Sequence, residues 1–480
     1  MSIKRVAASG VRWMAMAQAV TTLLQLAQTV VLARLLAPED FGLMAMVLVV
    51  VGFAHAYADM GLSNALIFRQ DTTRQQLSSL YWLNLAAGLV VFAGVLLAAP
   101  FAALAFNEPR LEDLMRLAAF VFLLVPPGQQ FQILLQKHLR FRNLALAETA
   151  AALLGAVVAV AAALEGYGAW ALLVGYLATA GSKTMLLMRL GWREWRPGLR
   201  FSARDLRGYL GFGLYQMGER SLNFFSTRWD QMLIGSMLGA QALGYYLLAH
   251  LLVMQPIQKL NPVVMRVAFP MFARVQADTE ALKAGYLMML RVLTSVTFPI
   301  LIGLGAIAPW LVPLVFGEQW HPAVPLVQIL AAAGLLRAAG NPVSTLMLAR
   351  GRADLTFKWN VVVALALLPA LAAGAWLGGT VGVAWAVLAV SLVAAVGSYR
   401  FLVRSQLGPC LGGFLRSLAP PFVISCIMAA NVLLLTAAGG VPSVLSLGLI
   451  VAEAGVVYAG LYYLLQREQF LEFRDLVLGP

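Results

Sequence analysis

Five basic residues lie within long apolar stretches of the chain, where they could bind an anion. They are Arg220, Arg228, Lys259, Arg291 and Arg337. If these stretches cross a membrane, each charge costs about 3 kcal/mol at mid-membrane and must face water, a partner or a ligand. An Arg side chain can donate two parallel hydrogen bonds to a phosphate. We therefore expect Arg220, Lys259 and Arg337 to bind an anionic, phosphate-bearing molecule; internal ion pairs are the alternative.

Two of these cations have competing interpretations. Arg291 lies near the start of its apolar stretch, so its long side chain could reach the interface, and a binding role and a structural role are equally open. Arg228 lies two residues from Asp230. An ion pair between these two residues is the favoured interpretation of Arg228.

Polar residues repeat at helical spacing in two of the apolar stretches. One stripe consists of Gln216, Arg220, Asn223, Thr227 and Gln231, and the other of Gln18, Thr21, Gln25 and Gln28. Residues three and four apart share one face of a helix. Polar faces of this kind cannot face lipid, and together they predict a hydrated cavity.

Carboxylates in the same stretches could carry protons or bind Na⁺. Glu219, Asp230 and Glu453 are the candidates, although pairing with nearby arginines or capping hydrogen bonds explain them as well. We expect no resident cofactor beyond a coupling ion. We also expect no metal site, because neither Cys410 nor Cys426 stands in a Cys-x-x-Cys or Cys/His ligand spacing.

The composition places these residues in a membrane protein. Of the 480 residues, 61% are hydrophobic and only 11% are charged, and the mean hydropathy is +0.82. Such values exclude an ordinary soluble chain. The net charge of +13 would suit a nucleic-acid partner only if the basic residues clustered on one water-facing surface.

Hydrophobic runs long enough to cross a bilayer recur along the whole chain. A helix of roughly 20 apolar residues spans the membrane core, and we count about 14 such runs. They cover 11–33, 42–66, 79–106, 114–135, 143–164, 168–190, 208–234, 242–265, 285–307, 323–348, 357–377, 380–402, 417–437 and 443–465. The chain is thus predicted to be an all-α membrane protein, with the division at Gly378 and Gly379 the hardest to assign.

The basic residues follow the positive-inside rule on this arrangement. With the amino terminus inside, 26 of the 34 Lys and Arg residues mark cytoplasmic segments, and three, Arg34, Arg110 and Arg116, mark the outside. Both termini are then cytoplasmic, and no nucleic-acid partner is needed to explain the charge. No connection is long enough for a catalytic domain and no GxxxxGK[ST] loop occurs, so we expect neither an enzyme nor an ATP-driven pump.

An internal repeat at an offset of about 202 residues indicates two related halves. It superimposes RLLAPEDFGL on SMLGAQALGY, so that Gly42 falls on Gly244. Because the offset is six helices, the two units share one orientation and are related by an axis along the membrane normal. We predict a six-helix lobe over 1–190, an interfacial linker over 191–207, a second six-helix lobe over 208–404, and an extra helix pair with a cytoplasmic end over 405–480. Trp192, Trp195 and Phe201 among the arginines of the linker suit a helix lying at the cytoplasmic interface.

These motifs resemble the multidrug/oligosaccharidyl-lipid/polysaccharide exporter superfamily, within it the bacterial polysaccharide flippases of the colanic-acid exporter type. The resemblance depends on ARLLAPEDFGLMAM, on YADMGLSNALI and above all on RWDQMLIGSMLGAQALGYYLLA at 228–249. In the last stretch Asp230, Gly235, Gly239, Gly244 and Tyr245 are similar to family positions. The helix count extends the resemblance over nearly the whole chain.

The resemblance implies an inner-membrane flippase for undecaprenyl-diphosphate-linked oligosaccharide repeat units, which works by alternating access of its two lobes. The substrate-binding residues would be Arg220, Lys259, Arg337, Arg291, Gln18, Gln25 and Asn223, and the ion-coupling residues Glu219 and Asp230. The partners it implies are the polyprenyl-diphosphate-linked oligosaccharide, the lipid bilayer, and the polysaccharide polymerase and export machinery, with no nucleic acid.

Two transporters of the same superfamily are alternatives. A proton-coupled drug antiporter typically places a carboxylate in its first helix, whereas this first helix has only Gln and Thr at those positions. A lipid II flippase tends to carry an arginine there, and the middle of this helix has none. A membrane glycosyltransferase or polymerase would need a long catalytic loop, which the sequence lacks. A scaffold is disfavoured, because five buried cations would destabilise it without serving a function.

Overall fold

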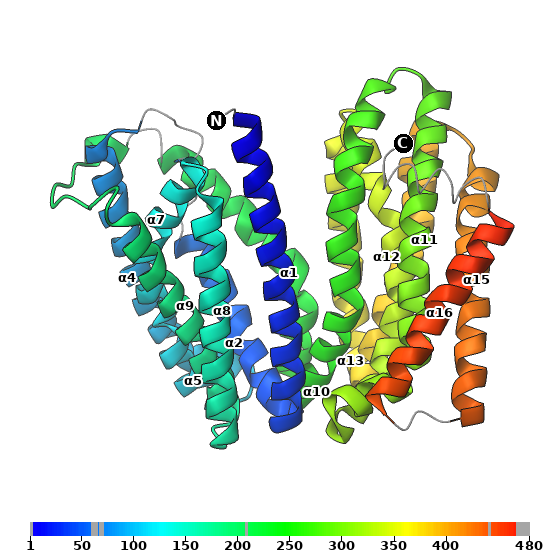
Figure 1. Ribbon diagram of the computed structural model, residues 1–480, viewed down its shortest axis with the longest axis horizontal. Coiled ribbons are helices and arrows are strands. Elements are labelled where there is room, and N and C mark those ends of the chain that lie inside the picture. Colours follow the sequence, from blue (N-terminus) through cyan, green and yellow to red (C-terminus); the bar gives the residue numbers. More distant parts are fainter. Residues whose placement is uncertain (1–2, 59–65, 67–71, 207–209, 440–442, 467–480) are drawn as a thin grey trace. The chain divides into compact units, whose positions relative to one another are not determined.

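The chain is built almost entirely from long helices, because an apolar surrounding leaves backbone groups no partner outside their own helix. The computed structural model describes residues 3–58, 66, 72–206, 210–439 and 443–466. Within these ranges the side chains of 3–11, of most of 210–227 and of several residues of 262–267 are not described. The described part is 90% helical and contains no strand, which confirms the predicted all-α class (Figure 1).

The helices follow one another with short connections (Figure 1). The first half of the chain contains α1 (Ile3–Leu35), α2 (Pro38–Ala58), α4 (Arg74–Ala105), α5 (Arg110–Ala118), α6 (Val121–Leu124), α7 (Pro126–Lys137), α8 (Phe141–Leu164) and α9 (Ala169–Gly191). The long α10 (Leu210–Arg274) leads into α11 (Thr279–Leu311), α12 (Val324–Ala349), α13 (Ala353–Gly397), α14 (Arg404–Leu407), α15 (Leu411–Gly439) and α16 (Val444–Leu465). Short 3-10 and π-helical turns join several of them.

Breaks within the longest helices give the predicted number of spans. Eleven helices are long and apolar enough to cross a membrane, and a twelfth span consists of α5 and α6 followed by α7, with a bend of 43° before Pro126. Two of the long helices are interrupted, α10 at Gly239 and α13 at Gly378 and Gly379. Gly239 and Gly379 have φ of 84° and 56°, which a residue with a side chain rarely adopts. If each of these two interrupted helices counts as two, the 12 spans of the described chain become the 14 predicted.

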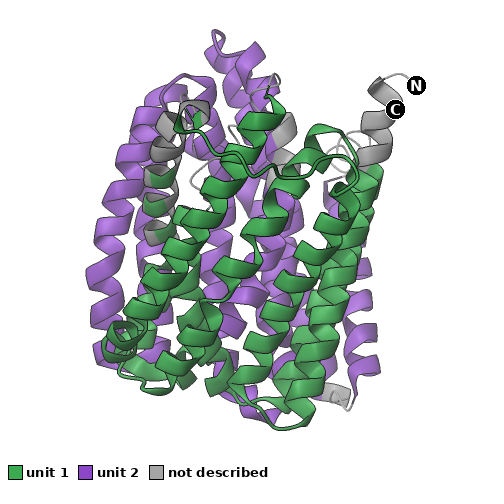
Figure 2. Cartoon of the chain, turned by 90° about the vertical axis from the view of Figure 1, so that its left-hand side faces the viewer, with its two compact units in different colours: residues 1–244 green, residues 245–480 purple. Residues whose placement is uncertain are grey.

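The chain divides into two compact units, 1–244 and 245–480, which Figure 2 colours separately. In unit 1 the helices pack around an aromatic cluster in which the rings of Tyr81, Phe131 and Trp195 lie 5.6–6.4 Å apart. In unit 2 the buried Phe272, Tyr286 and Leu346 belong to one apolar core. The predicted lobe limits at 190 and 208 and the axis that relates the lobes stay predictions.

The connection after α9 is not the interfacial helix that its composition predicts. Residues 192–202 are not helical, and only Ala203–Leu206 form a short 3-10 turn. The backbone of Gly198 bonds to α4 twice, accepting from Trp82 Nε1 at 2.8 Å and donating to Ser78 Oγ at 2.9 Å. Trp195 is buried against Tyr81. These contacts, which lie far apart in the sequence, tie the connection to α4 in place of an independent helix.

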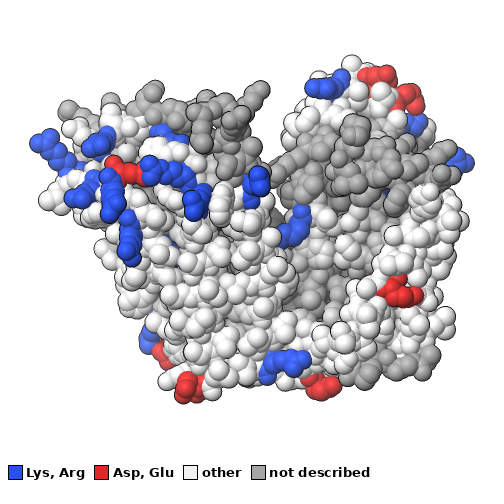
Figure 3. Space-filling model, viewed as in Figure 1, with Lys and Arg blue, Asp and Glu red and all other residues white. Residues whose placement is uncertain are grey.

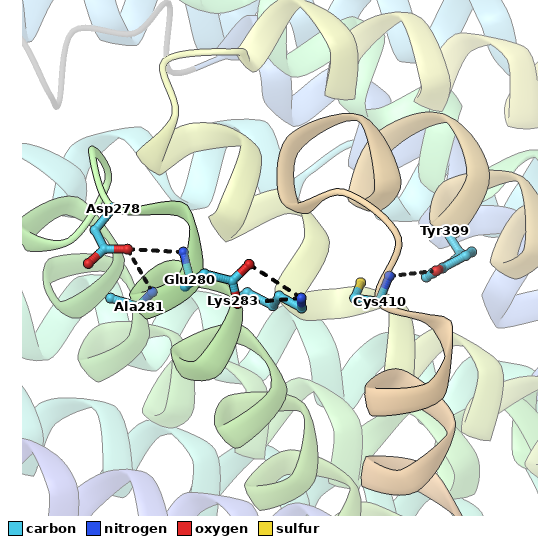
Figure 4. Close-up of polar contacts among 6 residues, drawn as sticks. All are labelled: Asp278, Glu280, Ala281, Lys283, Tyr399 and Cys410. Carbon is cyan, nitrogen blue, oxygen red and sulfur yellow. Dashed lines mark hydrogen bonds and ion pairs between the residues drawn. The ribbon is translucent and has the colours of Figure 1, made fainter.

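In unit 2, local hydrogen bonds hold the start of α11 and the turn before α15 (Figure 4). Asp278 Oδ1 caps α11 by accepting from the backbone N–H groups of Glu280 and Ala281, at 3.0 and 3.1 Å. Tyr399 Oη accepts from the N–H of Cys410, which anchors the turn before α15.

The connections predicted to face the outside are charge-balanced. Arg110 pairs with Glu108 at 2.8 Å and with Glu39 at the start of α2. The Arg110 guanidinium holds the pKa of the Glu108 carboxyl below its usual value, mainly through this hydrogen bond. Arg116 pairs with two carboxylates of its own helix, Glu112 and Asp113. These pairs fix the corner where α4, α5 and α2 meet.

Two glycines bring α2 and the middle of α10 into backbone contact within unit 1. A Cβ added to Gly42 would lie 1.7 Å from the carbonyl oxygen of Ala240, and one added to Gly244 would lie 1.9 Å from that of Pro38. The contact is reciprocal in the register of the predicted repeat, because Pro38 and Ala240 are the same 202 positions apart as the two glycines. No larger residue fits at either position without moving the helices.

Gly42→Ala is expected to lower the free energy of unfolding by about 1–3 kcal/mol, because the added methyl group meets backbone rather than a flexible side chain. The thermal unfolding temperature of the purified chain measures the effect. Gly94→Ala on α4 is the matched control, since nothing lies within 4 Å of its added Cβ. An equal response of both variants would show that the close contact is not formed.

Candidate functional site

The cation Arg337 lies in the middle of α12, in unit 2, and has no carboxylate partner among the described residues. It stands 12 residues before the end of α12 at Ala349, which is about 18 Å along the helix. Its Nη1 lies 4.0 Å from Met254 Sδ of α10, a weak acceptor. The side chain is nonetheless exposed in this structure. Its guanidinium therefore has several N–H donors for a ligand.

Helices α10 and α12 run parallel and meet next to Arg337. Val253 of α10 lies against Gly334 of α12, and further along both helices Met265 Sδ accepts from Thr345 Oγ1 at 2.9 Å. Lys259 lies on α10 between these two contacts and is exposed. The structure thus brings two of the predicted binding residues, Arg337 and Lys259, to one pair of helices.

Arg291 lies further inside its helix than its position in the sequence indicates. Because α11 begins at Thr279, Arg291 is 12 residues into the helix, about 18 Å from its start. Its Nε is buried, and no described residue accepts a hydrogen bond from that atom. This position favours a ligand-binding role for Arg291 over a side chain that extends to the membrane interface.

Asn341 is a polar residue of this region that the sequence analysis missed. It follows Arg337 by four residues and so lies on the same face of α12. Its Nδ2 is buried without an acceptor in the described chain. The signal was the Arg–Asn pair at helical spacing inside an apolar stretch.

Other cations prove to be structural. Arg350 ends α12 and donates to the Gln276 carbonyl, to Thr279 Oγ1 and to the Gln406 carbonyl, at 2.8–3.1 Å. It thereby ties three segments of unit 2 together. Lys183 lies inside α9, eight residues before Gly191, within the predicted run 168–190. It forms an ion pair of 2.9 Å with Glu148 of α8.

The predicted polar positions of unit 1 are only partly described. Gln18 and Gln25 are exposed on α1, and Gln18 Nε2 donates to Thr22 Oγ1 at 3.3 Å. The side chains of Arg220, Asn223 and Glu219 lie outside the described part of the chain. Their roles stay predictions.

Around Asp230 the local contacts differ from the expected ion pair. Arg228 Nη1 donates to Gln231 Oε1 at 2.7 Å, and Asp230 Oδ1 accepts from the Gln231 N–H at 2.8 Å. Gln231 thus mediates between the two charged residues. Asp230 is half-buried, in keeping with an ionisable group inside a membrane helix.

A further carboxylate, Glu453, has a neutral partner. Asn431 Nδ2 of α15 donates to both Glu453 carboxylate oxygens, at 2.8 and 3.1 Å. This pair joins α15 to α16 near the middle of both helices. Since an amide partner accounts for Glu453, the interpretation as a helix-joining hydrogen bond is favoured over an ion-coupling one. No group of three His, Cys, Asp or Glu gathers as a metal site in the described part.

Basic side chains also gather at one end of unit 1, visible in Figure 3 at the end where α7 ends and α8 begins. Glu194 pairs with Arg140 and, at 3.3 Å, with His138. The guanidinium of Arg142 lies 5.3 Å from the Trp13 ring. A basic end beside aromatic rings is typical of a membrane interface.

Comparison with known proteins now places the chain. The lipopolysaccharide biosynthesis protein WzxC of Escherichia coli (strain K12) is 35% identical over 88% of this chain and 86% of its own length. The teichuronic acid biosynthesis protein TuaB of Bacillus subtilis (strain 168) is 34% identical over 89% and 88%. The succinoglycan biosynthesis transport protein ExoT of Rhizobium meliloti (strain 1021) is 29% identical over 97% and 94%.

Solved structures share the fold. The lipid II flippase MurJ in an inward closed conformation aligns with a TM-score of 0.74 and 11% identity, over 95% of this chain and 99% of that one. An inward-facing multidrug resistance MATE family transporter of the MOP superfamily aligns with a TM-score of 0.60 and 16% identity, over 83% and 95%. At these identities the likeness concerns the fold alone.

The family model described as "Polysaccharide biosynthesis protein" matches residues 31–325, which is more than half of the chain. The fold, the membrane helices and the relatives agree with this match over nearly the full length. The chain is a multi-pass membrane protein and belongs to the polysaccharide biosynthesis protein family.

Proposed function

We propose that the chain flips a polyprenyl-diphosphate-linked oligosaccharide across the bacterial inner membrane, from the cytoplasmic to the periplasmic leaflet, by alternating access. Relatives named for the biosynthesis or transport of surface polysaccharides support this proposal. The fold shared with a lipid II flippase supports the mode of action. Both termini would lie in the cytoplasm, and the chain would act as a transporter rather than as an enzyme.

The observation that carries the proposal is a set of N–H donors in unit 2 without acceptors in the described chain. They belong to Arg291, Arg337 and Asn341. Arg350 Nε also lacks an acceptor there, but both terminal nitrogens of that side chain bind the protein, so Arg350 is left out of the site. A cation kept at such depth costs several kilocalories per mole unless an anion is bound for part of the cycle. A diphosphate has enough oxygens to accept from all of these donors at once. We assign the diphosphate to these residues together with Lys259 and Arg220.

The sugars and the coupling ion complete the proposed site. Gln18, Gln25 and Asn223 would contact sugar hydroxyl groups, because amides both donate and accept hydrogen bonds. Glu219 and Asp230 would bind the H⁺ or Na⁺ that drives transport. The polyprenyl tail would stay in lipid, and the polymerase and export machinery would receive the product. A drug antiporter is less well supported, because unpaired cations repel cationic drugs.

Arg337→Ala is expected to lower the rate of flipping about 10- to 150-fold, because one charge-assisted contact contributes about 1.5–3 kcal/mol. Flipping of lipid-linked oligosaccharide in proteoliposomes measures the rate. Arg337→Lys should recover only part of it, since Lys keeps the charge but not the two parallel hydrogen bonds.

Arg352→Ala is the matched control for Arg337→Ala. Arg352 is exposed and pairs with Asp354 at 3.1 Å, and such a surface pair contributes about 0.2–1 kcal/mol at most. We expect this variant to flip its substrate at the native rate. Native flipping by Arg337→Ala as well would rule out the assigned role of Arg337.

Transport is expected to need an ion gradient, since nothing in the sequence supplies ATP hydrolysis. Collapsing the proton and Na⁺ gradients across the proteoliposome should stop net transport. Asp230→Asn should remove the response to one of the two gradients, because an amide neither carries a proton at neutral pH nor offers a charge to Na⁺. Net transport that continues without either gradient contradicts the coupling.

A further inference from the structure

A polar pocket of about 340 Å³ lies inside unit 1 between α7 and α9, and the proposed function does not use it. Its volume falls within the range of about 300–1,000 Å³ found for small-molecule sites. Its polar lining consists of Gln129, Gln132, Gln136, Tyr176, Thr179, Lys183 and Thr184, of which Thr179 donates to the Gly175 carbonyl of its own helix. So many polar groups in a membrane helix pair require a partner, water or a ligand.

The pocket faces the interior of unit 1 rather than lipid. On α9, Val174 and Met185 are large, apolar and exposed, so they mark the lipid-facing side. Lys183 and Tyr176 lie nine residues from Val174 and Met185, respectively. Nine residues are two and a half helical turns, which places the pocket residues on the opposite face.

Hydrogen bonds to neighbouring helices hold three of these side chains in place. Tyr176 Oη lies 3.2 Å from His55 Nε2 of α2, and Asn84 Nδ2 of α4 donates to Gln129 Oε1 at 3.3 Å. Lys183 donates to Glu148 of α8. Three neighbouring helices thus orient the pocket in advance of any ligand, which lowers the entropic cost of binding.

Three of the remaining polar side chains have no hydrogen-bond partner among the residues that the structure describes. The amides of Gln132 and Gln136 and the hydroxyl of Thr184 make no hydrogen bond in the described part of the structure. Gln132 and Gln136 lie four residues apart on one face of α7, and Gln129 lies three residues before Gln132. These groups are left to donate to and accept from a ligand or water.

The charge of the pocket selects the class of ligand. Its one cation, Lys183, is neutralised by Glu148 at 2.9 Å, so a phosphate gains little there. Neutral amides and a hydroxyl, each able to donate and accept, match the hydroxyl groups of a sugar. Apolar walls formed by Val125, Ile133 and Leu187 suit the C–H faces of a sugar ring.

We propose that this pocket binds a sugar ring of the lipid-linked oligosaccharide, apart from the cations that bind its diphosphate. The inference rests on the proposed function, because it assigns one part of the same substrate. This pocket would then recognise the glycan, and the cations assigned to the diphosphate would recognise the carrier common to all such lipids.

Binding of two probes to the purified full-length chain tests the inference. The first probe is lipid-linked oligosaccharide extracted from cells that lack the chain, and the second is undecaprenyl diphosphate without sugars. In a Gln132→Leu, Gln136→Leu double variant the Kd of the first probe should rise about 10-fold, as expected for two lost hydrogen bonds. The Kd of the second probe should not change, which also shows that the variant is folded.

Matched variants separate the pocket from general effects. Gln328→Leu makes the same replacement on α12 outside the pocket and should bind both probes as the native chain does. Thr184→Val keeps the side-chain shape and should weaken only the first probe, about 3-fold. Arg337→Ala should weaken both probes, because both contain the diphosphate.

Each other outcome overturns a defined statement. If the double variant binds the first probe as tightly as the native chain, or weakens both probes equally, the pocket does not bind the sugar, while the proposed function stands. If the native chain binds neither probe and cells that lack it export polymer normally, the proposed function fails, and the assignment of the pocket fails with it.

Discussion

A polar group inside a membrane must find its partner within the protein, and this constraint governs the whole structure. The backbone meets it by remaining helical, so the described chain is 90% helix. Helices are interrupted at few places, notably before Pro126 and at Gly239, Gly378 and Gly379. Proline lacks the donor that would be lost, and glycine reaches backbone angles that other residues avoid.

The same constraint separates structural from functional side chains. Arg110, Arg116 and Lys183 have carboxylate partners, and Arg350 donates to oxygens of three segments. The charged ends of these side chains are bound by groups of the protein itself, although Arg350 Nε is buried without an acceptor in the described chain. By contrast, Arg291, Arg337 and Asn341 keep N–H groups that no described residue accepts. An anionic substrate that arrives and leaves can meet this need without fixing the protein in one conformation.

In the proposed transporter, two kinds of polar surface bind two different parts of the substrate. Unpaired guanidinium groups suit a diphosphate, whereas the glutamines of α7 beside a neutralised Lys183 suit sugar hydroxyls. Tight helix packing supports both regions. Gly334 admits Val253 beside Arg337, and Gly128 brings α7 close to Thr184 of α9. A larger residue at either glycine would separate the helices that carry the binding groups.

The sequence by itself determined the class of protein, the helices and the family motifs. The length of each apolar run and the distribution of Lys and Arg between connections are local properties, and the bilayer acts on them directly. It also singled out Arg337 and Arg291 as unusual. Only the tertiary structure decided which polar residues have partners, since Lys183 and Glu148 are 35 positions apart and Trp82 and Gly198 are 116 apart. Partnering depends on which helix faces meet, and that follows from packing of the whole chain rather than from any single stretch.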